Sequence, residues 1–371
     1  MNIDGNLAAI QNWITNRLDE TELGNNRIAG IIGDGPSHYS RSPALWNAGF
    51  GHFGINTVYL PFDVTASCLR DLVSVLRNCD RFIGMNVTVP HKVRIMELLD
   101  ELDPCSQRIR AVNTVVRTSA GRLLGFNTDG EGFIQSISMP QPGQLQPFMH
   151  SLTGRNILLL GAGGSARAVA FHLSDHLKNG RLVISNRTLA HAVALAGEVQ
   201  KLGCNALAIS EAEVAVWAPK VSLIVNSTTK GQGGLARRLS NEVTYLEPFS
   251  SLAPASTPAL RGFSGNEAAV QQRWRELADP AIDANIKISM AIAASVPKGV
   301  GFYDLIYHPE ETVFLTHGRL TDHPTMNGKA MIINQAVIAF CKLICSAELT
   351  TRGIDAPEAE RQLLEVMYQA W

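Results

Sequence analysis

The segment at 161–168 (GAGGSARA) constrains the fold of this chain more than any other. It directly follows the apolar stretch NILLL at 156–160, and the helical pattern RAVAFHLSDHL follows it. A glycine-rich turn between a buried strand and a helix is typical of a dinucleotide-binding βαβ unit. Gly161 permits the tight turn, and Gly163 lets the backbone approach a pyrophosphate at the N-terminus of the helix. This context favours a dinucleotide site over a turn that is merely tight.

The residues after the next strand indicate which dinucleotide is bound. The apolar stretch RLVIS at 181–185 ends in Asn186, Arg187 and Thr188, where an NAD-binding chain would carry an acidic residue for the ribose. A guanidinium can pair with a 2′-phosphate, which a carboxylate would repel. The pattern therefore favours NADP. The alternative is an ordinary exposed arginine after a strand.

Alternating strands and helices extend over most of the chain and predict an α/β fold. In the first part, strands are expected at 27–33, 56–64 and 82–89, after a helix with apolar residues at Leu7, Ile10, Ile14 and Leu18 and a cap at Asp4. A stretch rich in Pro, Gln and Gly at 139–155 breaks the pattern and indicates a domain boundary. A second series of strands opens at 156 and resembles the βαβ units of a parallel sheet. Residues 233–300 interrupt it with a Pro-, Ser- and Ala-rich loop and a helix near 268–280.

Composition excludes several classes of function. Lys and Arg number 32 against 33 Asp and Glu, so the chain has no basic surplus for nucleic acid or an anionic membrane. No apolar run approaches the ~20 residues of a membrane span, and the N-terminus is not that of a signal peptide. We expect a soluble, cytoplasmic protein. The six cysteines have no metal-ligand spacing, and Cys341 and Cys345 are expected to be packed, reduced thiols.

Three polar segments of the first part are not explained by core packing. They are SRSP at 40–43, NVTVPHK at 86–92, and the pair AVNT and GFNTDG, which contain Asn113 and Asp129. Taken one at a time, each has a local explanation, such as a helix cap for a serine or a solvated surface for a lysine. The three segments are informative when they are considered together with the other motifs of the chain.

The ordered set of motifs resembles the shikimate dehydrogenase family, over roughly residues 28–232 and 300–345. In chain order the motifs are SRSP at 40–43, NVTVPHK at 86–92, AVNT at 111–114, NTDGEGF at 127–133, GAGGSARA at 161–168, NRT at 186–188, NSTTKG at 226–231, DLIYHPEET at 304–312 and MNGKAMIINQA at 326–336. An ordered set of this kind is much more specific than a glycine-rich turn alone.

The resemblance implies reversible, NADP-dependent reduction of 3-dehydroshikimate to shikimate, a step of aromatic amino-acid biosynthesis. It makes Lys92 the proton-transfer residue and Asp129 its partner. A lysine beside the reacting oxygen can exchange a proton once burial makes its charged form less stable, whereas a neighbouring carboxylate acts the other way. The implied substrate-binding residues are Ser40, Ser42, Thr88, Asn113, Tyr307 and Gln335. The implied cofactor-binding residues are Gly161, Ala162, Gly163, Gly164, Ser165, Ala166, Asn186, Arg187, Thr188, Asn226, Ser227 and Thr228.

The same resemblance implies the domain plan. A substrate-binding α/β domain would span 1–135 and be completed by the C-terminal helices at 328–371. A Rossmann-type, doubly wound domain would span 150–327, with the insertion at 233–300 either covering the cofactor or forming a subunit contact. The chain would work as a monomer or homodimer on a small-molecule substrate, without a metal.

Three positions depart from the family pattern. Tyr39 stands where a histidine usually precedes the serine, His191 stands where a second basic residue would complete the phosphate clamp, and Gln232 replaces a methionine. Use of NAD therefore stays open, as does a quinate/shikimate or aminoshikimate dehydrogenase. A third reading is a catalytically silent sensor of the metabolite, against which the retained Lys92 and Asp129 argue.

Overall fold

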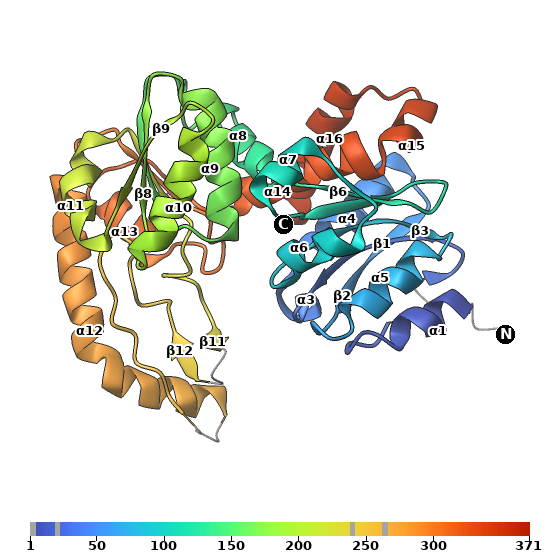
Figure 1. Ribbon diagram of the computed structural model, residues 1–371, viewed down its shortest axis with the longest axis horizontal. Helices are drawn as coiled ribbons and strands as arrows, with labels where there is room; N and C mark the ends of the chain where they lie inside the picture. Colours follow the sequence, from blue (N-terminus) through green and yellow to red (C-terminus); the bar gives the residue numbers. More distant parts are fainter. Residues whose placement is uncertain (1–4, 19–22, 238–241, 262–265) are drawn as a thin grey trace. The chain divides into compact units, whose positions relative to one another are not determined.

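The computed structural model describes residues 5–18, 23–237, 242–261 and 266–371, and its α/β architecture confirms the predicted fold class. The chain forms two compact units (Figure 1). Unit 1 comprises Met1–Phe133 and Ile332–Trp371, and unit 2 comprises Ile134–Met331. Each unit is built around its own six-stranded sheet.

The sheet of unit 1 is mixed, with the strand order β2-β1-β3-β5-β6-β4. The first three strands of this order are parallel, whereas β5 is antiparallel to both of its neighbours. The strands are β1 (Arg27–Gly33), β2 (Thr57–Asp63), β3 (Phe82–Val87), β4 (Glu101–Leu102), β5 (Thr114–Arg117) and β6 (Leu123–Phe126). The helices are α1 (Gly5–Gln11), α3 (Pro36–Tyr39), α4 (Ser42–Phe53), α5 (Leu69–Arg77), α6 (His91–Arg94), the 3₁₀ helix Ile95–Leu98 and α7 (Pro104–Ile109). The next helix, α8 (Asp129–Ser138), begins in unit 1 and continues into unit 2.

One face of this sheet is covered by α4 together with the end of the chain. Trp46 of α4 is fully buried, with its ring centroid 4.9 Å from that of Tyr59 on β2 and 5.3 Å from that of Phe340. The C-terminal segment supplies α14 (Lys329–Ile338), α15 (Ser346–Thr351) and α16 (Ala356–Ala370). Because aromatic burial dominates core energetics, the last forty residues are an integral part of unit 1.

The C-terminal segment predicted as helical at 328–371 is not one regular helix. Between α14 and α15 the chain forms a π-helical turn over Ala339–Ile344, in which the N–H of Cys345 reaches the carbonyl of Phe340 at 2.9 Å. The prediction that Cys341 and Cys345 are packed is confirmed, because both lie in the core. Burial raises the pKa of the Cys341 thiol to about 12. All six cysteines are free.

The predicted N-terminal helix is shorter than its apolar spacing suggests. It ends at Gln11, although Ile14 and Leu18 are buried as predicted. The side chain of Gln11 accepts a hydrogen bond from the N–H of Leu18 and donates one to the carbonyl of Asn16. These bonds stabilise a compact loop in place of further helical turns. The predicted cap, Asp4, lies outside the described residues.

This loop provides hydrogen-bond partners for the backbone groups at the edge of β2. Asn16 donates to the carbonyl of Pro61 at 3.0 Å and accepts from the N–H of Asp63 at 2.8 Å, and the N–H of Thr15 donates to the carbonyl of Asp63. An edge strand left unpaired would be a template for aggregation. The N-terminal segment therefore protects the sheet as well as extending its core.

Unit 2 contains a fully parallel sheet with the strand order β14-β13-β10-β7-β8-β9, the order of a doubly wound dinucleotide-binding fold. The strands are β7 (Asn156–Leu160), β8 (Arg181–Ser185), β9 (Asn205–Ile209), β10 (Leu223–Asn226), β13 (Gly301–Asp304) and β14 (Thr325–Met326). The helices of this fold are α9 (Gly164–Leu177), α10 (Leu189–Gln200), α11 (Val214–Trp217), with 3₁₀ turns at Glu211–Glu213 and Ala218–Lys220, and α13 (Val313–Leu320). The central strands are buried, as their continuous apolar runs predict.

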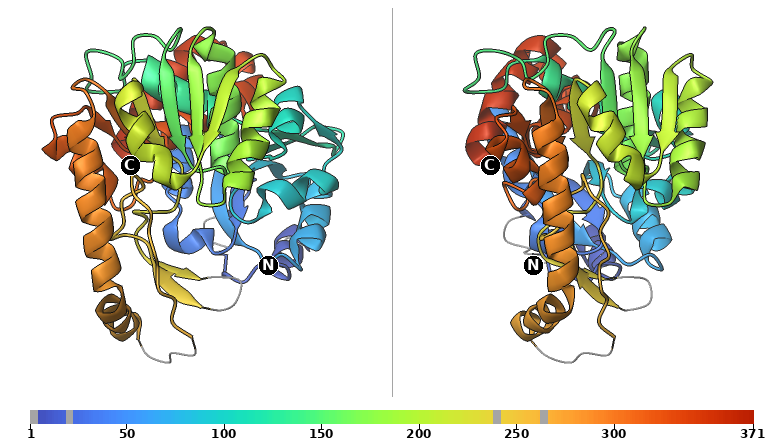
Figure 2. Two further views of the ribbon diagram at one scale, coloured as in Figure 1. Left: turned by 60° about the vertical axis from the view of Figure 1, so that its left-hand side comes forward. Right: turned by 90° about the vertical axis from the view of Figure 1, so that its left-hand side faces the viewer.

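The insertion at 233–300 is a small subdomain of unit 2. A hairpin of β11 (Leu235–Arg237) and β12 (Val243–Tyr245) lies beside α12 (Glu267–Ser295) (Figure 2). Trp274 of the helix is buried against the hairpin and donates from Nε1 to the carbonyl of Pro258 at 2.7 Å. The predicted helix at 268–280 is thus too short, because α12 continues past Pro280 to Ser295.

No helix in the described part of the chain is both long enough and apolar enough to cross a membrane.

Candidate active site

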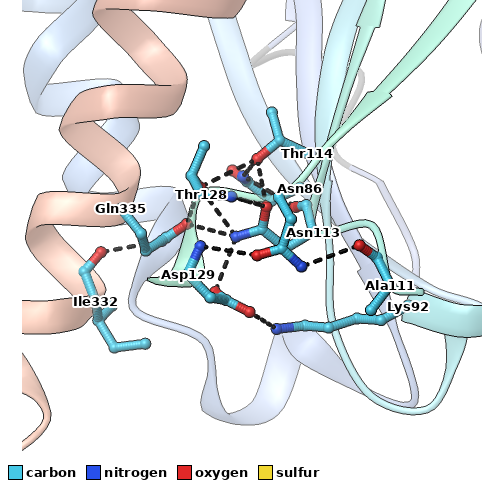
Figure 3. Close-up of polar contacts among 10 residues, drawn as sticks. Asn86, Lys92, Ala111, Asn113, Thr114, Thr128, Asp129, Ile332 and Gln335 are labelled. Carbon is cyan, nitrogen blue, oxygen red and sulfur yellow. Dashed lines mark hydrogen bonds and ion pairs between the residues drawn. The ribbon is translucent and has the colours of Figure 1, made fainter. Parts of the chain in front are cut away.

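Lys92 and Asp129 form an ion pair in unit 1. Lys92 lies in α6, directly after β3, and Asp129 is the first residue of α8, after β6. The Nζ atom of Lys92 donates to Oδ2 of Asp129 at 2.6 Å, and the two side chains are 22% and 9% exposed (Figure 3). The ammonium group keeps two further N–H donors. Lys92 can therefore hold a proton on Nζ, remain bonded to Asp129, and still donate a hydrogen bond to a ligand. The structure brings together the two residues that the resemblance implies, whereas their role stays a prediction.

Asn113 orients this pair. Its amide nitrogen donates to Oδ1 of Asp129 at 2.8 Å, and its amide oxygen accepts from the N–H of Thr128 at 2.8 Å. The backbone of Asn113 is held in turn, because its N–H donates to Phe126 and its carbonyl accepts from Val87. A buried amide bonded on both sides holds its neighbours in one arrangement. Both oxygens of the Asp129 carboxylate therefore have a defined donor.

Gln335 reaches the same cluster from α14, 222 residues further along the chain than Asn113. Its Oε1 atom lies 3.2 Å from both the amide nitrogen of Asn113 and the hydroxyl of Thr128, and its Nε2 donates to the carbonyl of Ile332 (Figure 3). The close approach requires Gly132 on α8, where an added Cβ would lie 2.6 Å from the backbone nitrogen of Gln335. The C-terminal segment thus completes the cluster.

Asn86 and Tyr59 extend the cluster towards the predicted serines, and sequence reasoning gave neither a role. The Tyr59 hydroxyl donates to Oδ1 of Asn86 at 2.6 Å, and the Asn86 amide donates to the Thr114 hydroxyl at 3.2 Å. Tyr59 is buried, and burial raises its pKa well above the ordinary value. Asn86 was visible as the first residue of NVTVPHK, but a tyrosine on a strand carries no comparable signal.

The remaining predicted substrate-binding residues lie on segments of the chain other than those of Asn113, Asp129 and Gln335. Ser42 is the buried first residue of α4, and its N–H donates to the Ser40 hydroxyl at 3.2 Å. Thr88 follows β3, with its N–H bonded to the carbonyl of Ile32. Tyr307 lies in unit 2, after β13, so its predicted contact with a substrate stays a prediction.

In unit 2 the glycine-rich turn fits a dinucleotide. Gly161 has φ +112°, a region that side-chain-bearing residues rarely adopt, and an added Cβ would lie 2.6 Å from the Ser227 hydroxyl oxygen. At Gly163 and Gly164, in contrast, an added Cβ would meet nothing within 4 Å. The backbone at the N-terminus of α9, with Ser165 exposed and Ala166 buried behind it, is therefore open to an anionic group.

The loop after β8 presents a cation. Arg187 and Thr188 are exposed, and Arg187 makes no ion pair with any residue that the structure describes. Asn186 donates to the carbonyl of Thr188 at 3.0 Å, and this carbonyl also accepts from the N–H of His191. A guanidinium without a carboxylate partner at the end of the second strand fits a 2′-phosphate.

The loop after β10 is held by a buried carboxylate. The amide of Asn226 donates to Asp304 at 2.9 Å, and its oxygen accepts from both the N–H and the hydroxyl of Thr228. Ser227 donates to the carbonyl of Leu160 at 2.7 Å. Burial raises the pKa of Asp304 to about 7, although hydrogen bonds from Ile306, Thr312 and Asn226 lower it. Asp304 is the first residue of the DLIYHPEET motif, but the sequence analysis gave it no role.

Among the described residues, no group of three or more His, Cys, Asp or Glu side chains is placed to hold a metal ion.

A doubly wound parallel sheet with an open glycine-rich turn, joined to a second α/β unit with a buried polar cluster, is the architecture of a dinucleotide-dependent dehydrogenase. Comparison with known proteins specifies the family. The shikimate dehydrogenase substrate-binding domain matches residues 31–115, and the shikimate/quinate 5-dehydrogenase family matches residues 145–245. The chain belongs to the shikimate dehydrogenase family.

Individual relatives are similar to this chain over most of its length. A shikimate dehydrogenase (NADP⁺) of Bacillus cereus is 38% identical over 315 residues, 85% of this chain and 91% of the relative. The Thermus thermophilus shikimate 5-dehydrogenase, solved with NADP(H) and shikimate, is 26% identical with a TM-score of 0.61, covering 93% of this chain and 99% of that one. A quinate dehydrogenase of Corynebacterium glutamicum shares the fold, at 23% identity and a TM-score of 0.61, covering 92% and 99%.

Proposed function

We propose that the protein is a shikimate dehydrogenase that reduces 3-dehydroshikimate to shikimate with NADPH and catalyses the reverse oxidation with NADP⁺. The observation that carries this proposal is the Lys92–Asp129 ion pair, whose Nζ–Oδ2 distance is 2.6 Å, within the polar cluster of unit 1. A protein that only bound the metabolite would not need a paired acid and base at this point. Membership of the family and the NADP⁺-dependent relatives support the same reading.

The polar cluster of unit 1 would hold the substrate. The hydroxyl groups of Ser40 and Ser42 can donate to a carboxylate, and the N–H of Ser42 donates to the Ser40 hydroxyl at 3.2 Å. The remaining proposed ligands of the carboxylate end and ring hydroxyls are Thr88, Asn113, Tyr307 and Gln335. Hydroxyl and amide groups suit a ring that carries several hydroxyls, because each can both donate and accept.

Lys92 would move the proton. In the reducing direction, its ammonium group donates a proton to the ketone oxygen while a hydride arrives at the carbon, so the product is a neutral secondary alcohol. Asp129 accepts one N–H of Lys92 and is itself held by Asn113, which leaves the other N–H donors to face the substrate. In the oxidising direction the neutral amine takes the hydroxyl proton. Asp129 thus orients the base and stabilises the ammonium that forms.

Unit 2 would hold the cofactor, which when bound supplies or accepts the hydride. The open turn formed by Gly161, Ala162, Gly163, Gly164, Ser165 and Ala166 would face the pyrophosphate. Asn186, Arg187 and Thr188 would meet the adenosine ribose and its 2′-phosphate. The loop of Asn226, Ser227 and Thr228 would lie on the nicotinamide side. Asp304 holds this loop by accepting a hydrogen bond from the amide of Asn226.

One observation favours a second candidate. The exposed His191 on the first turn of α10 is a weaker partner for a 2′-phosphate than a permanently charged side chain, so an NAD-using quinate/shikimate dehydrogenase is the alternative. The fold does not separate the two candidates, because the quinate dehydrogenase shares it.

The test is a steady-state assay of nicotinamide absorbance with shikimate or quinate, each with NADP⁺ or NAD⁺. Rapid turnover of shikimate with NADP⁺ is expected, with a loss of about 10²–10⁴-fold in kcat for Lys92→Ala. Lys201→Ala, an exposed lysine at the end of α10, is the matched control and should leave kcat unchanged. Preference for quinate and NAD⁺ would establish the second candidate. Binding of shikimate without turnover by the wild-type protein would refute both.

A further inference from the structure

Lys230 is a largely buried cation in the loop after β10, 9% exposed, and the proposed mechanism does not use it. Its Nζ atom donates to Oε1 of Glu211 at 2.6 Å and to the carbonyl of Ala253 at 2.9 Å. The side chain of Glu211 is 20% exposed. A buried charge of this kind persists only when it is paired, so the ammonium and the carboxylate depend on each other.

The pair lies at the edge of the sheet where a dinucleotide binds. Arg187 follows β8, Glu211 follows β9 and Lys230 follows β10, and these strands belong to one parallel sheet, so all three residues are at its carboxyl edge. In doubly wound folds the adenosine end of the cofactor lies at this edge, next to the second strand. The Lys230–Glu211 pair therefore borders the region next to Arg187 where the adenosine end of the cofactor is expected to bind.

Arg187 is one of the charges that act on Lys230. Burial lowers the pKa of Lys230 most, Glu211 raises it, and the positive charge of Arg187 lowers it further. Two cations and one carboxylate thus share this edge. A doubly charged phosphate placed there would be attracted by the cations and repelled by Glu211.

The insertion holds Lys230 in this position. The carbonyl of Ala253, which accepts from Lys230, also accepts from the side chain of Asn285 on α12 at 3.1 Å. Asn285 is buried and makes further hydrogen bonds to the backbone of Ser250 and Pro254. A buried and fully bonded amide makes the loop rigid. The loop at 250–254 is therefore a fixed support beneath the ammonium group.

We propose that Lys230 determines cofactor specificity. The insertion holds Lys230 where it neutralises Glu211 beside the adenosine site, and this permits a 2′-phosphate to bind there. Lys230 thus partly replaces the second basic residue of the phosphate clamp, whose position His191 occupies. The inference rests on the proposed function and names the residue that sets its preference for NADP. It also gives the insertion a role in cofactor choice.

The experiment compares Lys230→Met, Glu211→Gln and the double variant, with Lys201→Met as the matched control. Lys230→Met should raise KM for NADP⁺ by about tenfold or more and change KM for NAD⁺ by less than about threefold, because the unpaired Glu211 repels only the extra phosphate. The double variant should recover KM for NADP⁺ to within about threefold of the wild type, since no carboxylate is left to neutralise. The control should change neither constant.

Equal increases in both KM values, without recovery in the double variant, would show that Lys230 only supports the fold and would overturn the inference. An unchanged ratio of the two KM values would also overturn it. Direct titration of NADP⁺ and NAD⁺ by calorimetry compares the two dissociation constants without turnover. A wild-type protein that prefers NADP⁺ in the titration but does not oxidise shikimate would refute the proposed function while leaving the specificity inference supported.

Discussion

The buried Asp304 should make the stability of the protein fall as the pH rises, and Asp304→Asn should remove this dependence. Three donors contact the carboxylate, namely the N–H of Ile306, the amide of Asn226 and the hydroxyl of Thr312. Each lowers the pKa, but burial outweighs them and raises it from 3.8 to about 7. Asparagine keeps the shape and an acceptor for the backbone donor without a titratable charge.

The sign and size follow from proton linkage. Between pH 3.8 and about 7 the native protein retains a proton on Asp304 that the unfolded chain has released. The free energy of unfolding therefore falls as the pH rises through this window, and the loss is complete above it. The two pKa values differ by about 3, and each unit corresponds to about 1.4 kcal/mol, so the upper bound is about 4 kcal/mol.

The measurement is differential scanning calorimetry of the wild type and the variant at several pH values from 4.5 to 8. The variant should gain stability relative to the wild type as the pH rises, by as much as about 4 kcal/mol across the window. Asp322→Asn is the control in the same unit, because Asp322 is exposed and Lys298 lowers its pKa. A difference between wild type and Asp304→Asn that is constant with pH would refute the argument that burial dominates at this carboxylate.

Three further substitutions test other parts of the structure. Gly161→Ala should lower the free energy of unfolding by about 1–3 kcal/mol in urea denaturation and weaken NADP⁺ binding in a fluorescence titration, because the backbone has φ +112° and the added Cβ meets Ser227; unchanged binding would contradict this. Trp46→Ala should destabilise unit 1 by about 3–5 kcal/mol, since the residue is fully buried among aromatic rings, and a loss below 1 kcal/mol would contradict that packing. Asn16→Ala should cost about 1–2 kcal/mol and increase aggregation on heating, measured by light scattering, because the edge of β2 loses two hydrogen bonds.

The sheet of unit 2 was predictable because its physical signal is local. Strands buried on both faces appear as continuous apolar runs, and the glycine-rich turn marks the start of α9 without reference to any other part of the chain. The N-terminal helix shows the opposite case. Ile14 and Leu18 have helical spacing and are buried, yet side-chain hydrogen bonds from Gln11 end the helix first. Spacing alone does not contain that competition.

The site was predictable only in part for a related reason. Lys92, Asp129, Asn113 and Gln335 come together in the structure, and their motifs are distinctive enough to be found in the chain. Tyr59 and Asp304 were missed because their importance arises from contacts between distant segments. A tyrosine or an aspartate on a strand looks ordinary until the fold buries it against an amide.

The discontinuity of unit 1 has a consequence for synthesis on the ribosome. Its sheet and α4 are translated first, but the helices that cover the face around Trp46 come from Ile332–Trp371, after all of unit 2. At ordinary translation rates the roughly 200 residues between take on the order of 10 s or more to make. The nascent chain therefore carries an uncovered aromatic face during that interval, when chaperones can bind it, while unit 2, which is continuous, can fold as soon as it emerges. A premature stop before Gln335 removes the cover of unit 1 and Gln335 together, whereas a stop just after the π-helical turn removes only α15 and α16.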